Sequence, residues 1–311
     1  MKVVTLSGGV GGARFLRGLV DVVEPEGVTV IWNVGDDVEI LGLHVSPDLD
    51  SILYALSGLA DEERGWGRAD ETWNALGAVE GLRGESWFRL GDRDLGLHLV
   101  RTQALRAGAP LSVVTARLAA ALGLEAKLLP ATDDRLRTRL DTPAGSFPFQ
   151  TWFVERGHRD EVDAVHYVGA DAAGPAPGVL AALEDADVVV LAPSNPYVSI
   201  GPILAVRQIR DALARDETRC VAISPLVGGR AVKGPADRML ARLAGGTSPA
   251  HVARFYAGLV DAFVLDEADA DGAGAVAELG IRPIVTRTLM VDGDARSRLA
   301  EAALDVAGVP L

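Results

Sequence analysis

Four aspartates lie close together in the sequence, just after an apolar run that is typical of a buried strand. The run extends from Val28 to Trp32, and the carboxylates that follow it are Asp36, Asp37, Asp48 and Asp50. Open parallel sheets bind ligands at the carboxyl ends of their strands, and Mg²⁺ there usually takes one or two carboxylates plus substrate phosphate oxygens. We therefore predict that Asp36 and Asp48 hold Mg²⁺. Alternatively, Asp36 and Asp37 form a solvated turn and Asp48 caps a helix that begins near Leu49.

A glycine-rich segment is expected at the same edge of the sheet. It connects a predicted strand, Val3 to Leu6, to a helix that begins at Ala13, and its glycines are Gly8, Gly9, Gly11 and Gly12. Backbone N–H groups without neighbouring side chains, at a helix N-terminus, can approach a phosphate closely. We predict that this segment binds the diphosphate of a nucleotide; the alternative is a tight turn without a ligand.

The glycine segment matches neither of the two common nucleotide fingerprints. A P-loop ends in Gly-Lys-Ser or Gly-Lys-Thr, and no such sequence closes this segment. The dinucleotide fingerprint needs a third glycine where this chain has Arg14, and an acidic residue at the end of the second strand, where this chain has Asn33. A nicotinamide-dependent oxidoreductase is therefore disfavoured.

Polar loops follow two later strands. Ser194 and Asn195 follow the apolar run Asp187 to Ala192, and the loop Ser224 to Gly229 follows the next apolar run. Their hydroxyl, amide and backbone donors suit the phosphates or the base edge of a nucleotide. We therefore include Ser194 and Asn195 in the predicted nucleotide site, together with Asn33.

Tryptophans and arginines gather in two segments of the chain. Three of the five tryptophans, Trp66, Trp73 and Trp87, lie within residues 64–74 and 87–94, beside arginines and aspartates. Flat rings with neighbouring polar groups can hold a heteroaromatic ligand in one orientation. The alternative is that these rings pack in the core.

Histidine and cysteine give no sign of metal binding or nucleophilic catalysis. The five histidines show no metal-ligand spacing, and the single cysteine, Cys220, lies in a predicted buried strand. One cysteine excludes a disulfide framework and a cysteine-rich metal site, so oxygen ligands and Mg²⁺ are favoured over zinc. His98 and Arg101, one turn apart on a predicted helix, form the one pair that could act together.

A parallel sheet is needed to bring these candidate residues together, and the sequence predicts one. Apolar runs alternate with helical patterns, with strands expected at 3–6, 28–32, 187–192, 220–223, 262–265 and 284–286 and helices from 13, at 203–213 and at 295–307. The expected fold class is α/β: a Rossmann-like, mostly parallel sheet flanked by helices. We interpret residues 1–311 as a single domain with a mainly helical insertion at 50–125 and a segment at 127–170 that contains a β-hairpin around Pro143, Ala144 and Gly145.

Composition excludes several classes of function. Of the 311 residues, 49% are hydrophobic, which is enough for a large core. The net charge of -13 argues against nucleic-acid partners, because phosphate contacts need a basic surface. No stretch approaches the ~20 apolar residues of a membrane span, and the N-terminus runs into the glycine segment where a signal peptide would have its apolar core. We predict a cytoplasmic protein without membrane partners.

The chain resembles the 2-phospho-L-lactate transferase family, which makes the deazaflavin coenzyme F-420, and the resemblance extends from end to end. The motifs that carry it are SGGVGGARFLRG, NVGDD, SPDLDSILY, RGWGRADETWN, WFRLGDRDLGLHLVR, YVGAD, LAPSNPYVSIGPIL and SPLVGG. The resemblance implies Mg²⁺-dependent transfer of a phospholactyl or phosphoenolpyruvyl group from its guanosine diphosphate conjugate to the terminal ribityl hydroxyl of the deazaflavin precursor Fo, with release of GMP. It also implies a homodimer. The sequence leaves open which of the two acids is transferred.

Roles for individual residues follow from the same resemblance. Asp36 of NVGDD and Asp48 of SPDLD match the metal carboxylates, and the nucleotide residues named above would face the guanosine diphosphate. The residues expected at Fo are Asp50, Arg89, Trp87 and Arg93. Asp50 is also the candidate for orienting the attacking hydroxyl or taking its proton.

A second function stays open at this stage. A non-catalytic regulator of the same superfamily would bind a sugar nucleotide and respond by a change of shape. Such a protein does not need the segments around Trp66, Trp73 and Trp87 as a platform for a deazaflavin, so we favour the enzyme.

Overall fold

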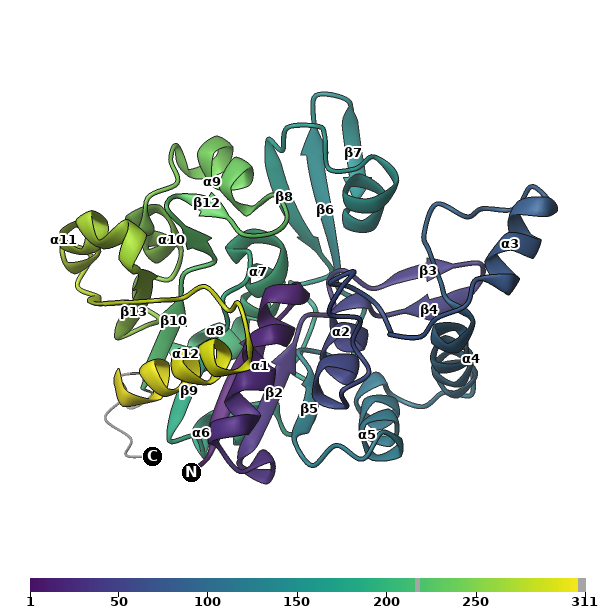
Figure 1. Cartoon of the computed structure of the whole chain (residues 1–311), viewed down its shortest axis with the longest axis horizontal. Coiled ribbons are helices and arrows are strands. Elements are labelled where there is room, and N and C mark those ends of the chain that lie inside the picture. Colours follow the sequence, from purple (N-terminus) through teal and green to yellow (C-terminus); the bar gives the residue numbers. More distant parts are fainter. Residues whose placement is uncertain (216–218, 307–311) are drawn as a thin grey trace.

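A seven-stranded parallel sheet forms the centre of the molecule. The computed structural model describes residues 1–215 and 219–306 (Figure 1). In spatial order the strands are β14 (Arg282–Thr286), β13 (Ala262–Asp266), β10 (Cys220–Ile223), β9 (Val188–Leu191), β1 (Val3–Ser7), β2 (Val28–Trp32) and β5 (Lys127–Pro130). All neighbours pair in parallel. The predicted α/β fold is confirmed.

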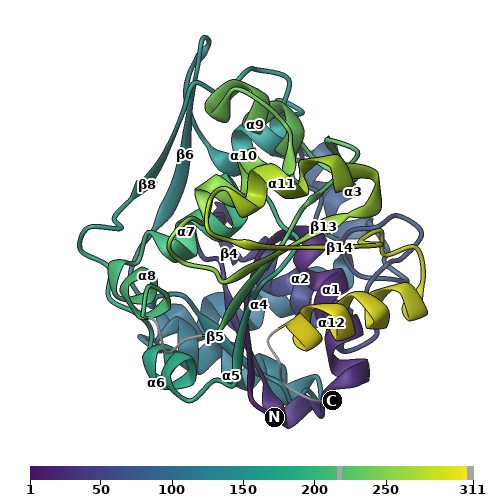
Figure 2. The ribbon, with the colours of Figure 1, turned by 90° about the vertical axis from the view of Figure 1, so that its left-hand side faces the viewer.

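Helices cover both faces of this sheet. On one face α1 (Gly9–Val22) contacts α2 (Pro47–Leu56) and α12 (Gly293–Val306), and on the other face α6 (Val179–Glu184) contacts α8 (Arg207–Leu213), as Figure 2 shows. Strands buried on both faces read as continuous apolar runs, which is why the sequence located them well. No helix in the described residues is long and apolar enough to cross a membrane.

The order of the strands reverses beside β1. From β1 the chain moves to β2 and β5, and it then returns to β9 on the opposite side of β1. In open α/β sheets, ligands bind in the crevice at such a reversal, outside the carboxyl ends of the strands. The loops after β1 and β9 therefore lie where this architecture usually places a ligand.

A small antiparallel sheet rises beyond one end of the main sheet (Figure 1). Its order is β7 (Gly145–Pro148), β6 (Arg137–Thr142) and β8 (Ala164–Val168), and Thr142 pairs with Gly145 across the predicted turn. The expected hairpin is confirmed. Within the predicted hairpin segment, residues 127–130 belong instead to the main sheet as β5, and Thr151–Glu155 form a helical turn.

The segment between β2 and β5 is mainly helical, as expected, but it starts with an unpredicted hairpin. Its helices after α2 are α3 (Asn74–Gly81), α4 (Asp92–Arg106) and α5 (Leu111–Ala121). The hairpin consists of β3 (Val38–Ile40) and β4 (Leu43–Val45). Leu41 and Gly42 between them both have positive φ, of 51° and 74°, as a two-residue hairpin turn requires. Three-residue strands of mixed polarity leave too little pattern to detect.

Two helix boundaries also differ from the sequence prediction. Helix α1 begins at Gly9, not Ala13, so the glycine segment is mostly the first turn of the helix. The helix expected at 203–213 is two helices, α7 (Gly201–Leu204) and α8. The predicted end of the last helix, Ala307, lies outside the described residues. The remaining α-helices and β-strands of the described residues are β11 (Leu226–Val227), β12 (Arg230–Ala231), α9 (Ala236–Ala244), α10 (Pro249–Phe255) and α11 (Ala273–Ala277).

Candidate active site

Asp48 is the point at which three segments of the chain meet. It lies in the first turn of α2, where its Oδ1 accepts a hydrogen bond from the Gly9 backbone N–H at 2.8 Å. Its Oδ2 accepts one from Asn33 Nδ2 at 2.9 Å, and the same amide also donates to the Val198 carbonyl at 3.1 Å. The glycine segment, the end of β2 and the start of α2 therefore converge at one edge of the sheet, as the sequence predicted.

Both ends of the Asn33 side-chain amide form hydrogen bonds within the protein. It is fully buried, and its Oδ1 accepts a hydrogen bond from the Gly35 N–H at 2.7 Å in addition to the two bonds that its Nδ2 donates. An amide with both ends engaged fixes its neighbours in place. Asn33 thus positions Asp48 and the turn that contains Asp36.

The glycines of α1 allow close packing more than they open the backbone to solvent. A Cβ at Gly8 would lie 2.6 Å from Asp48 Oδ2, a Cβ at Gly11 would collide with the Pro193 carbonyl oxygen, and a Cβ at Gly12 would collide with Ser7 Oγ. Gly9 has a positive φ of 66°, and its N–H is held by Asp48. These contacts bring the N-terminus of α1 against β9 and α2, which differs from the open phosphate cradle expected from the sequence.

Ser194 and Asn195 follow β9, but their side chains point to different neighbours. Ser194 Oγ donates to the Gly8 carbonyl at 2.6 Å, so Ser194 lies beside the glycine segment. Asn195 Oδ1 accepts from the Tyr197 N–H at 2.9 Å, and its Nδ2 lies 3.3 Å from Met239 Sδ. Asn195 therefore caps the helical turn that follows it.

Asp36 and Asp37 are buried in the turn after β2. The Oδ1 atom of each has no hydrogen-bond partner among the described residues, and Asp37 Oδ2 lies 2.9 Å from His44 Nε2. Burial raises the pKa of Asp36 well above its usual value, and the neighbouring Asp48 carboxylate raises it further. Burial also raises the pKa of Asp48 to about 6, although the hydrogen bonds from Gly9 and Asn33 act in the opposite direction. These two carboxylates repel each other, and neither of them forms an ion pair with a side chain of the described residues.

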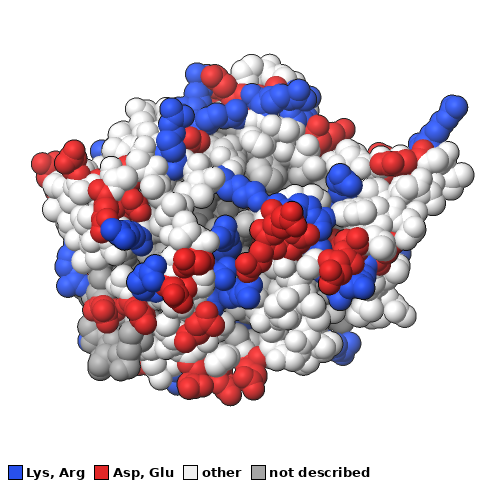
Figure 3. All heavy atoms as spheres, in the orientation of Figure 1, with Lys and Arg blue, Asp and Glu red and all other residues white. Residues whose placement is uncertain are grey.

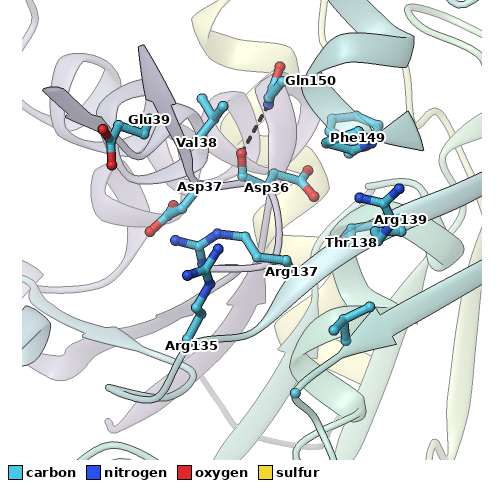
Figure 4. Close-up of a pocket in the computed structure, with 14 residues that line it drawn as sticks. Asp36, Asp37, Val38, Glu39, Arg135, Arg137, Thr138, Arg139, Phe149 and Gln150 are labelled. Atoms are coloured by element: carbon cyan, nitrogen blue, oxygen red, sulfur yellow. Dashed lines mark hydrogen bonds between the residues drawn. The ribbon is translucent and has the colours of Figure 1, made fainter. Parts of the chain in front are cut away.

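A cavity of about 520 Å³ opens beside Asp36. Acidic residues from the turn after β2 lie on one side of it, and Arg135, Arg137 and Arg139 reach into it from β6 and the segment before β6 (Figure 4). Positive and negative side chains are also interspersed at the centre of this face of the molecule (Figure 3). The complete lining is Gly35, Asp36, Asp37, Val38, Glu39, Arg135, Arg137, Thr138, Arg139, Pro148, Phe149, Gln150, Val168 and Gly169.

Sequence reasoning missed these three arginines. Their one signal was the alternation of arginine at positions 135, 137 and 139, which places at least the last two on one face of a strand. Such a pattern on its own is also typical of a solvated strand face, so it did not single them out.

Asp50 faces away from Asp48, toward α4. Both of its carboxylate oxygens accept from Arg101, through Nη2 and, at 3.2 Å, through Nη1. His98 Nδ1 lies 3.8 Å from Asp50, and His98 Nε2 lies 3.3 Å from Asp94, which also accepts from Tyr54 Oη. Burial raises the pKa of Asp50, while Arg101 and His98 lower it. The pair His98 and Arg101 noted in the sequence thus belongs to a buried network around Asp50.

The structure brings together some of the predicted aromatic residues. The rings of Trp66 and Trp73 lie 6.5 Å apart, with the Arg64 guanidinium over both of them, and Arg89 lies 4.6 Å from the Trp73 ring. Trp87 instead packs edge-on against Phe88 at 5.6 Å, in a small apolar cluster with the β3–β4 hairpin.

Arg93 has an exposed side chain at the start of α4. Its backbone N–H donates to Glu71 at 2.9 Å. Of the four residues expected at Fo, Arg89 is therefore the one that contacts this tryptophan pair, through the Trp73 ring.

Comparison with known proteins identifies the family. The family model described as 2-phospho-L-lactate transferase CofD matches residues 3–289. The chain belongs to this family. Relatives named phosphoenolpyruvate transferase are 46% identical in Streptomyces griseus, over 99% of this chain and 98% of the relative, and 43% identical in Thermobifida fusca, again over 99% and 98%. A third, from Mycolicibacterium smegmatis, is 40% identical over the whole of both chains.

A solved structure agrees with the fold. A member of the UPF0052 family from Bacillus halodurans superposes with a TM-score of 0.67, at 19% identity, over 97% of this chain and 98% of the other. The resemblance seen in the sequence is confirmed, and the protein is a transferase of the CofD family.

The residues of this CofD-family transferase fit Mg²⁺ better than a metal that needs a complete protein cage. The described residues contain no group of three or more histidine, cysteine, aspartate or glutamate side chains arranged to hold a metal ion. Mg²⁺ commonly takes one or two carboxylates and completes its shell with waters and substrate phosphates. Asp36 and Asp48 supply two carboxylates, and Asp36 Oδ1 is a buried acceptor without a donor.

Proposed function

We propose that this transferase moves a phosphoenolpyruvyl group, or its phospholactyl counterpart, from a guanosine diphosphate conjugate to the terminal ribityl hydroxyl of Fo. The reaction releases GMP and belongs to coenzyme F-420 biosynthesis. The names of the relatives at 40–46% identity favour the enolpyruvyl donor. One observation carries the proposal: Asp36, Asp48 and the Gly9 N–H meet at the carboxyl edge of the sheet, beside a cavity that contains three arginines.

In the proposed reaction, the ribityl hydroxyl oxygen attacks the phosphorus that carries the acid. A new P–O bond forms to the ribityl chain, the P–O bond to the GMP phosphate breaks, and the hydroxyl proton is released. Asp36 and Asp48 would hold Mg²⁺, which supplies positive charge next to the phosphate oxygens when it is bound. The cavity arginines stabilise negative charge at the same edge, because they are already in place before the reaction.

Asp50 has a different role in this proposal from the one its sequence suggested. Arg101 occupies both oxygens of its carboxylate, so Asp50 suits the orientation of a hydroxyl, or of α2 itself, better than proton transfer. Trp66 and Trp73, whose ring planes are inclined at 59°, offer aromatic faces next to the Arg89 guanidinium, which suits the ring system of Fo.

The test is a direct assay of the three substrates. The purified protein is incubated with Fo, Mg²⁺ and either the enolpyruvyl or the lactyl guanosine diphosphate conjugate, and the products are weighed by mass spectrometry. We expect GMP and the Fo adduct of the transferred acid, with faster turnover of the enolpyruvyl donor. Saturable binding of a donor with neither donor consumed would instead identify a non-catalytic nucleotide-binding protein. For the variants tested in the experiments below, Arg117→Gln is the control, because Arg117 lies on the exposed surface of α5.

A further inference from the structure

We propose, on the basis of the function proposed above, that Arg135, Arg137 and Arg139 form a subsite for the transferred acid, a small molecule that carries both a phosphate and a carboxylate. The nucleoside part of the donor would then lie on the other side of Asp36 and Asp48, toward the crevice between β1 and β9. The donor would thus extend along the edge of the sheet, with its acid end in the cavity.

The first support is the position of charge around the cavity. Asp36, Asp37 and Glu39 line the same cavity as the three arginines. Even so, none of the three guanidinium groups forms an ion pair in the described part of the chain. Opposite charges that share a cavity of about 520 Å³ without pairing leave room for a ligand between them.

The second support is how the arginines are held. Arg137 Nη1 donates to the Leu136 carbonyl at 2.6 Å, and Arg139 Nη2 donates to the Ser146 carbonyl at 3.0 Å. These bonds to neutral carbonyls fix the side chains but leave their charge uncompensated. Both arginines lie on the same face of β6, which also brings Pro148 and Val168 of the neighbouring strands to the cavity.

The third support is the match between these groups and the ligand. A guanidinium presents a planar fork of donors that fits a carboxylate or a phosphate through two parallel hydrogen bonds. Three such forks can hold two anionic groups at once, whereas a single phosphate needs fewer. Phe149 adds one apolar wall, which suits the short carbon skeleton of a three-carbon acid.

The experiment measures binding without Fo, so that no catalysis is required. Binding of phosphoenolpyruvate and of GMP, each in the presence of Mg²⁺, is followed by isothermal titration calorimetry for the wild type, Arg137→Gln, Arg139→Gln and the control Arg117→Gln. We expect the dissociation constant of phosphoenolpyruvate to rise about tenfold or more in both cavity variants, which corresponds to about 1.4 kcal/mol. We expect GMP binding to change by less than about threefold, and the control to behave as the wild type.

Two results would overturn the proposal. One is phosphoenolpyruvate binding that is unchanged in both cavity variants or absent from the wild type. The other is a larger loss for GMP than for phosphoenolpyruvate, which would place nucleotide phosphates in the cavity. Arg139→Lys provides a check on folding and on specific geometry: it keeps the charge, and we expect it to recover only part of the affinity because the fork is lost.

The subsite and the proposed function can fail separately. Arginine-dependent binding of phosphoenolpyruvate without any transfer to Fo would support the subsite and contradict the function. Transfer to Fo with the wild-type KM for the donor in both cavity variants would support the function and contradict the subsite.

Discussion

Asp48 and Asp50 lie two residues apart on α2, yet the regions around them compensate buried charge in opposite ways. Asp48 accepts only neutral donors, the Gly9 N–H and the Asn33 amide, and it faces a second buried carboxylate, Asp36. Asp50 accepts a guanidinium through both oxygens and has His98 beside it. Around Asp50 the protein supplies its own counter-charge, and around Asp48 it does not.

This difference indicates which carboxylates are left for a ligand. A buried charge is costly unless it is paired, so a stable protein either provides a partner or binds one. The Asp36 and Asp48 region is the one in which an added cation would relieve repulsion. The Asp50 region is already balanced, and its expected function is to hold α2 against α4 so that Asp48 stays in place.

The largest expected effect is a loss of stability when the ion pair between Asp50 and Arg101 is broken. Arg101→Met leaves Asp50 buried without a counter-charge, and the loss of one partner from a buried ion pair costs about 3–5 kcal/mol. We expect the midpoint of urea unfolding to fall accordingly, while Arg117→Gln changes stability by less than about 0.5 kcal/mol. An Arg101→Met protein with the wild-type midpoint would mean that Asp50 has another source of compensation.

Asp36→Asn should lower activity without lowering stability, in contrast to Arg101→Met. It removes one of two charges that repel each other, so we expect the metal-free protein to be as stable as the wild type or more stable. Transfer to Fo should fall about 100-fold or more, which corresponds to at least about 2.7 kcal/mol of transition-state stabilisation. The rise in Tm that we expect when Mg²⁺ is added to the wild type should also be lost. Strong destabilisation of this variant without metal would mean that the protein itself compensates the charge of Asp36, as it does for Asp50.

The pH dependence of stability distinguishes the two regions further. The pKa of Asp48 is raised to about 6 in the folded protein, so its protonated form is favoured by folding. Protonated Asp48 therefore makes its full contribution to stability at low pH. This contribution, about 3 kcal/mol at most, is lost as the pH rises from about 4, the usual pKa of an aspartate, through about 6, the pKa in the folded protein. Measured without Mg²⁺ from pH 4 to pH 7, the Asp48→Asn variant should gain stability relative to the wild type as pH increases. A difference between the two proteins that does not change with pH would contradict the raised pKa.

The smallest expected effect is at the aromatic segment. Arg89 is exposed, and its contact with the Trp73 ring contributes about 0.5–1 kcal/mol at such a site. Arg89→Gln should change the unfolding free energy by less than about 1 kcal/mol, because neither buried region is touched. We expect the KM for Fo to rise about fivefold with little change in the KM for the donor. Equal changes in both values would indicate that this segment acts on the whole site and not on Fo.

The sheet and the place of the site could be predicted from the sequence for one physical reason. Buried parallel strands are continuous apolar runs, and their carboxyl ends meet at one edge, so the positions of Gly9, Asp48 and Ser194 relative to each other followed from the strands alone. The convergence of the glycine segment with Asp48 is an outcome of that geometry.

Other features depend on contacts between distant residues, which a single sequence does not reveal. Arg101 and Asp50 are 51 positions apart, and their pairing requires the crossing of α2 and α4. The sequence predicts open backbone at the glycine segment, but Pro193 and Ser7 occupy the space beside Gly11 and Gly12. The cavity arginines look like a solvated strand face until β6 is placed beside Asp36.

The most direct test of the active site is a titration of transfer activity with Mg²⁺ for the wild type and Asp48→Asn. Product formation from Fo and the enolpyruvyl guanosine diphosphate donor is measured in a single turnover at each metal concentration. We predict a saturable dependence on Mg²⁺ for the wild type, and for Asp48→Asn either no product or a requirement for at least about tenfold more Mg²⁺, since one of two carboxylates is lost. Equal rates for the two proteins at every Mg²⁺ concentration would contradict the assignment of Asp48 to the metal site.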